Sequence, residues 1–109
     1  MPSIADTPPP PYYAAIFTTV RTEHAEGYAD AAARMFELAA QQPGFLGVEI
    51  VADGRRSIGI SYWTDEAAMT NWRQNAEHLV IQQMGRERWY ESYSLRIARV
   101  ERCHAHPSL

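Results

Sequence analysis

Side chains that could carry chemistry are concentrated between Thr70 and Arg96. Trp72 and His78 are the two candidate catalytic residues in this segment. An indole ring can form one wall of a pocket and donate one hydrogen bond, while an imidazole can accept a proton near neutral pH. The residues that could bind a substrate beside them are Asn71, Asn75, Arg86, Trp89 and Tyr93.

None of the common catalytic or metal-binding motifs occurs in the chain. There is no P-loop, GxGxxG, GxSxG, CxxC or HExxH pattern. His104 and His106 resemble a pair of metal ligands, but two ligands on a flexible tail bind a metal weakly. No metal site is therefore expected.

The positions of these side chains depend on the helix that carries them. Apolar residues at helical spacing predict one helix over residues 64–84. Four polar residues would then share one face, which would either line a cleft or face water: Asn71, Asn75, His78 and Gln82. Trp72 and His78 would lie roughly 240° apart, so they could share a site only if the helix broke between them.

Each candidate also has a purely structural interpretation. Trp72 lies on the apolar stripe of the helix and could belong to the core. His78 has no apparent carboxylate partner and could be a surface residue. Arg86 could bind a carboxylate or a phenolate, or form an ion pair with Glu87 or Glu91.

Composition limits the class of protein. The 109 residues fit one domain, and a formal charge of -3 with no lysine argues against a nucleic-acid partner. A single cysteine predicts a cytoplasmic protein without an internal disulfide. No apolar run approaches the ~20 residues that span a bilayer, so no membrane partner is expected.

The order of predicted elements indicates a fold. Strands are expected over residues 12–21, 45–52, 56–63 and 93–102, and helices over residues 28–42 and 64–84. This βαββαβ order is typical of a ferredoxin-like α+β domain, with a four-stranded antiparallel sheet and two helices on one face. The domain is predicted over residues 12–102, between a disordered proline-rich arm (1–11) and a tail (103–109).

Both faces of the predicted sheet are apolar. Tyr13, Ala15 and Phe17 point to one face of the first strand, while Ala14 and Ile16 point to the other. In the second strand, Leu46, Val48 and Ile50 are expected on the face of the sheet opposite to that of Phe45. Helices cover only one face of the sheet. The apolar residues of the uncovered face predict a homodimer that pairs sheet against sheet.

Three segments together resemble the antibiotic biosynthesis monooxygenase-like family, in its small stand-alone bacterial branch. They are PGFLGVE (43–49), SYWTDEAAMTNWRQNAEHL (61–79) and GRERWYESYSLRIARVER (85–102). The resemblance implies a dimeric α+β barrel with a cleft between helices and sheet in each subunit. It further implies either cofactor-free oxidation of phenolic rings to quinones by O2, or binding and degradation of haem.

The chain departs from both activities of the family at specific positions. A helix tryptophan matters in both, and Trp72 is its counterpart. The haem degraders have a histidine near the position of Gln82 and an asparagine where this chain offers Thr18 or Thr19. The quinone-forming members have an asparagine where this chain has Ala68.

We therefore expect a cofactor-independent monooxygenase acting on a small electron-rich aromatic substrate. His78 or a water molecule would deprotonate the phenol, and no cofactor is expected, with haem a disfavoured alternative. The other interpretation is a binding or stress-associated dimer that holds a small hydrophobic or aromatic ligand without turnover.

Overall fold

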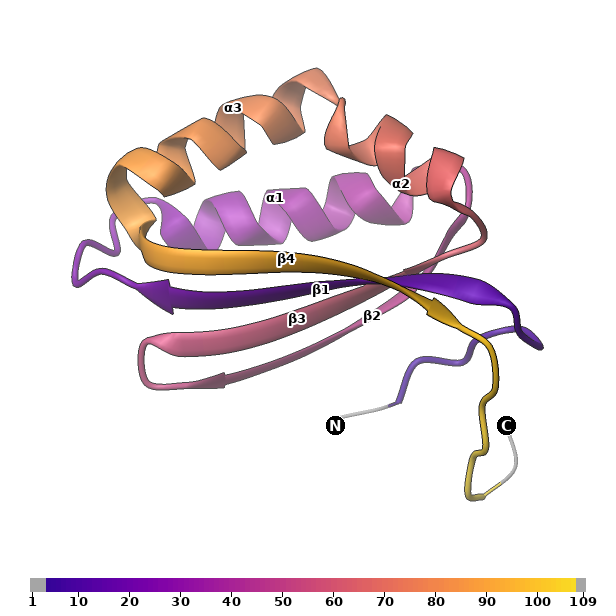
Figure 1. The fold of residues 1–109 in the computed structure, drawn as a ribbon. Helices are drawn as coiled ribbons and strands as arrows, with labels where there is room; N and C mark the ends of the chain where they lie inside the picture. The colour runs from indigo at the N-terminus through magenta and orange to yellow at the C-terminus, as the bar shows by residue number, and fades with distance from the viewer. Residues whose placement is uncertain (1–3, 108–109) are drawn as a thin grey trace.

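One antiparallel sheet forms the base of the molecule (Figure 1). The computed structural model describes residues 4–107. The strands are β1 (Tyr12–Arg21), β2 (Phe45–Asp53), β3 (Arg56–Trp63) and β4 (Tyr90–Val100), in the order β2-β3-β1-β4. Helices α1 (Tyr28–Ala40), α2 (Glu66–Arg73) and α3 (Ala76–Met84) lie on one face of this sheet (Figure 1).

This is the predicted ferredoxin-like α+β fold. The bounds of β1 and β3 agree with the prediction, because alternating apolar residues mark both strands clearly. The last strand begins at Tyr90, three residues before the predicted start at 93. A register shift after Val20 allows Arg21 to pair with Tyr90 and lengthens the strand.

The second helical segment is broken into two helices, where one was predicted. The side chain of Asp65 caps α2 by accepting from the backbone N of Ala68 at 2.8 Å. The side chain of Asn75 then caps α3 by accepting from the backbone N atoms of Glu77 (3.0 Å) and His78 (3.1 Å). The second cap restarts the helix in a new direction.

A short π-helix, η1 (Gly85–Trp89), joins α3 to β4. A Cβ atom at Gly85 would lie 2.5 Å from Cε2 of Tyr90, closer than packed atoms allow. Glycine is therefore needed here so that the ring of Tyr90 can pack against the backbone.

A bulge at the start of β2 changes the faces predicted for this strand. Phe45 pairs with Trp63, but the register shifts so that Gly47 pairs with Tyr62 and Val48 with Ser61. Phe45 therefore lies on the helix-facing side together with Val48, not opposite it, because the bulge adds one residue to the alternation. The ring of Phe45 packs edge-on against Trp63 at 5.4 Å.

The core lies between the helices and the central strands. Trp63 is fully buried at its centre. The buried residues around it are Ala39, Ala68, Met69 and Trp72. Edge strand β4 is less covered, because Tyr93, Leu95 and Ile97 point to the helix side yet remain 36–45% exposed.

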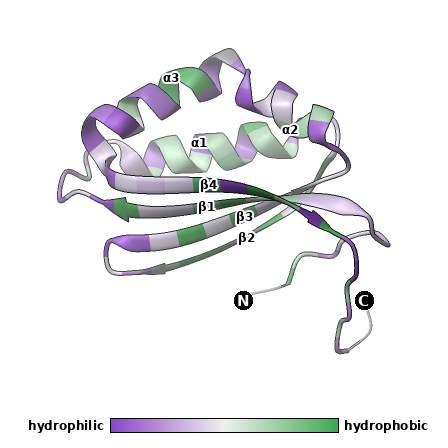
Figure 2. Ribbon diagram, in the orientation of Figure 1, coloured by the Kyte–Doolittle hydropathy of each residue, from purple (hydrophilic) through white to green (hydrophobic). Residues whose placement is uncertain are grey.

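The outer face of the sheet carries apolar residues as predicted, and Figure 2 shows apolar stretches along the strands. Val51 on this face is 65% exposed and pairs with Ile58 of β3. Within residues 4–107, no helix is long and apolar enough to cross a membrane.

The described part of the proline-rich arm contacts this outer face at one end. The backbone N of Ala5 donates to a Glu49 carboxylate oxygen at 3.0 Å, and the hydroxyl of Tyr62 donates to the other oxygen at 2.5 Å. The hydroxyl of Thr7 donates to that of Tyr12 at 2.9 Å. These contacts involve Ala5 and Thr7 alone, and the disorder expected for residues 1–11 stays a prediction.

Candidate functional site

The helix break brings Trp72 and His78 together. Their rings stack with centroids 4.2 Å apart and planes 21° apart. On one continuous helix these residues would point in different directions. The cap at Asn75 starts a new helix, and in its first turn the side chain of His78 lies against Trp72 near the end of α2.

The hydrogen bonds of His78 determine its tautomer. Nδ1 lies 2.9 Å from the carbonyl oxygen of Trp72, which can only accept, so Nδ1 carries a proton. In the neutral ring Nε2 is then the acceptor. Nε2 lies 3.3 Å from Nε2 of Gln82, whose amide donates to it.

Burial keeps this imidazole neutral. It lowers the pKa of His78 below the usual value for histidine. The bond to the Trp72 carbonyl opposes this change, while the positive charge of Arg73 adds to it. Near neutral pH, His78 is thus an uncharged ring with a lone pair on Nε2, which is the form that can accept a proton.

Trp72 is also part of the core. Its ring lies near that of Trp63, with centroids 6.4 Å apart and planes 24° apart. Only 9% of the residue is exposed. The core interpretation therefore applies to Trp72, and its contact with His78 keeps it beside the candidate base.

The two candidate asparagines have different roles. Asn71 is exposed on α2, whereas the side chain of Asn75 is used in capping α3. The predicted polar face of Asn71, Asn75, His78 and Gln82 does not exist, because the helix ends at Arg73. Within that set, the side chain of His78 contacts Gln82, and Asn75 reaches only the backbone of His78.

The remaining predicted residues lie apart from one another. Arg86 is exposed and donates to Oε1 of Gln83 at 3.0 Å. Trp89 is buried, and its Nε1 donates to the carbonyl of Glu26 at 3.0 Å. Tyr93 is 45% exposed on β4, with its ring 5.6 Å from that of Phe17.

A groove runs between α2 and β4 on the helix side of the sheet. Its volume is about 230 Å³, and it is lined by Glu66, Met69, Thr70, Arg73 and Ile97. The four α2 residues follow helical spacing from Glu66, which could have marked them as one face had the true start of the helix been known. Sequence reasoning missed Arg73, which lies between Trp72 and the helix break.

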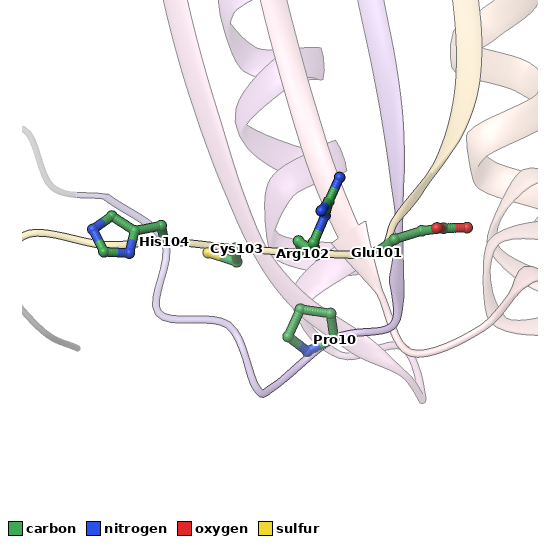
Figure 3. Close-up of a pocket in the computed structure, with 5 residues that line it drawn as sticks. All are labelled: Pro10, Glu101, Arg102, Cys103 and His104. Carbon is green, nitrogen blue, oxygen red and sulfur yellow. The ribbon is translucent and has the colours of Figure 1, made fainter.

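A second hollow of about 600 Å³ lies between the two terminal segments (Figure 3). It is lined by Pro10 and by residues that follow β4: Glu101, Arg102, Cys103 and His104. Their side chains point in different directions, with Arg102 and Glu101 turned away from Cys103 and His104 (Figure 3). The hollow brings no set of catalytic groups together.

A sequence profile of the antibiotic biosynthesis monooxygenase family matches residues 11–84. The chain belongs to this family. Uncharacterized protein YqjZ of Bacillus subtilis (strain 168) is 51% identical over 104 residues, which are 94% of this chain and 90% of that protein. The predicted family is thereby confirmed.

Two further proteins are similar to this chain, one in structure and one in sequence. The structure of SnoaB, a cofactor-independent oxygenase from Streptomyces nogalater, matches with a TM-score of 0.71 at 15% identity, over 91% of this chain and 100% of SnoaB. This likeness shows a shared fold. Jasmonate monooxygenase ABM of Pyricularia oryzae is 37% identical over 43 residues, or 39% of this chain and 20% of that protein.

Proposed function

We propose that this chain is a cofactor-independent monooxygenase that oxidises a small phenolic aromatic with O2. The observation that carries the proposal is the stack of His78 on Trp72, which places a neutral, partly buried imidazole in the second helical segment. A general base of this kind needs an available lone pair and a pKa below the working pH. The relation to SnoaB supports the reaction class.

Proton removal is the first step of the proposed reaction. Nε2 of His78 accepts the phenolic proton and becomes an N–H donor. The amide of Gln82 then turns so that its oxygen accepts from this new donor. Trp72 positions the base through its ring face and its carbonyl oxygen, which keeps Nδ1 as the donor in both protonation states.

The remaining steps need only O2. The phenolate transfers one electron to O2, and the resulting radical pair forms a carbon–oxygen bond at a ring C–H position. Loss of that hydrogen as a proton and cleavage of the O–O bond release water. One phenol and one O2 thus become one quinone and one water, and the substrate supplies all the electrons.

Haem fits these residues poorly. An axial histidine must offer a nitrogen to the iron. Nδ1 of His78 is committed to the Trp72 carbonyl, which leaves only Nε2, the atom that the proposed reaction uses to accept the phenolic proton. Gln82 itself stands near the position where the resemblance would place the haem-binding histidine. We therefore include no cofactor in the proposed reaction.

A homodimer and a cytoplasmic location complete the proposal. The exposed apolar residues of the outer sheet face would pack against the same face of a second copy. The substrate would approach on the opposite face, along the uncovered side chains Tyr93, Leu95 and Ile97 of β4. The two copies would then leave both clefts open.

Oxygen uptake tests the proposal directly. Purified protein would be mixed with a panel of naphthols, and O2 consumption and quinone absorbance would be followed together. We expect one O2 per quinone in the wild type and a loss of at least about 100-fold in His78→Gln, the usual scale for a general base. His24→Gln is the matched control, because His24 is exposed and lies outside the site. Binding without O2 uptake would support the non-catalytic interpretation instead.

A further inference from the structure

We propose that the substrate is an aromatic carboxylic acid, with its carboxylate bound by Arg73 in the groove between α2 and β4. This inference rests on the proposed function and specifies its substrate class. The groove lies beside the candidate base, because its residue Arg73 directly follows Trp72 in α2. The groove combines one cation, one anion and an apolar centre, and each part restricts the ligand.

Arg73 has an unused charge. Among residues 4–107, Arg34, Arg55 and Arg99 each form an ion pair with a glutamate, and Arg73 forms none. Its guanidinium also makes no hydrogen bond within that part of the chain. A planar guanidinium matches a carboxylate with two parallel hydrogen bonds, so an acidic ligand would supply the partner that the fold does not.

The centre of the groove suits an aromatic ring. Its apolar lining residues are Met69 of α2 and Ile97 of β4. The apolar surface continues along β4 through Leu95 and Tyr93, which are 36% and 45% exposed. Thioether and aliphatic side chains adapt well to a flat ring.

The other end of the groove sets the orientation of the ligand. Glu66 lies seven residues before Arg73, so the two residues are about 10 Å apart along the helix axis. A carboxylate is repelled by Glu66 and attracted by Arg73, and therefore belongs at the end of α2 next to the helix break. His78 lies just beyond this break, and the charge of Arg73 is felt at its ring.

A pair of ligands that differ only in the acid tests this inference. Binding of 1-hydroxy-2-naphthoate and of 1-naphthol would be measured by calorimetry at low ionic strength in wild type, Arg73→Gln and Arg88→Gln. Arg88 is the matched control because it is exposed and lies outside the groove. We expect wild type and Arg88→Gln to bind the acid about tenfold more tightly than the naphthol.

In Arg73→Gln this preference should disappear while the Kd for 1-naphthol stays unchanged. A preference that persists in Arg73→Gln, its absence in the wild type, or a failure of both ligands to bind would overturn the inference. If both ligands are oxidised with equal efficiency, the monooxygenase proposal stands and only the preference for a carboxylic acid is contradicted. Binding that depends on Arg73 but is not accompanied by O2 uptake would support the carboxylate site and contradict the monooxygenase proposal.

Discussion

His78 contacts Trp72 twice, through its ring face at 4.2 Å and through Nδ1, which lies 2.9 Å from the Trp72 carbonyl oxygen. The two contacts constrain the imidazole in both tilt and rotation. Because one residue supplies both, any change that moves the end of α2 relative to α3 alters them together. The turn between the helices is therefore as important for the proposed base as the ring itself.

Removing the cap of α3 should loosen this arrangement. We expect Asn75→Ala to lower the free energy of unfolding by about 1 kcal/mol, since two backbone N–H groups lose their acceptor. Asn75→Asp keeps an acceptor at the same position and should stay near wild type. Urea denaturation measures the stability, and the ring-current shift of the His78 protons in NMR spectra measures the stack. An Asn75→Ala protein with unchanged shifts would show that the cap does not position His78.

The pH dependence of stability should carry the signature of His78. Its pKa in the folded protein is lowered, mainly by burial, so the unfolded chain binds more protons between the folded pKa and about 6.5. The free energy of unfolding should therefore rise with pH through that window and fall as the pH drops below about 6.5. Urea titrations at a series of pH values measure this slope, which should flatten in His78→Gln. A slope that is the same in both proteins would assign it to other groups.

The strands could be predicted from the sequence to within three residues, because the alternation of apolar residues is a local signal. The bulge that changes the faces of β2 could not, because it depends on pairing with β3. The break before α3 could not, because apolar residues continue at helical spacing through Trp72 and Leu79 and suggest one helix. Asn75 followed by Ala-Glu-His is a capping sequence, but it competes with this stripe, and only tertiary packing decides between them. Arg73 was missed for the same reason, since its groove depends on how α2 lies over β4.

Gln82 should tune the basicity of His78. Its amide donates to the neutral ring at 3.3 Å, and such a bond favours the uncharged form. Gln82→Glu should raise the pKa of His78, because a carboxylate at this distance favours the imidazolium. Gln82→Met, which fills a similar volume without a donor, should raise it less. NMR titration of the His78 ring measures all three proteins, and an unchanged pKa in Gln82→Glu would place the Gln82 side chain elsewhere in solution.

The outer face of the sheet should be the site of dimerisation. Val51 is 65% exposed there and pairs with Ile58, so Val51→Glu can be accommodated in a single subunit but places a charge in a sheet-to-sheet interface. We expect light scattering at micromolar concentration to show a dimer for the wild type and a monomer for this variant. Val80→Glu is the matched control, since Val80 is 59% exposed on α3 and far from the outer face. If Val80→Glu dissociates the dimer and Val51→Glu does not, the helices and not the sheet form the interface, and the proposed access along β4 must be revised.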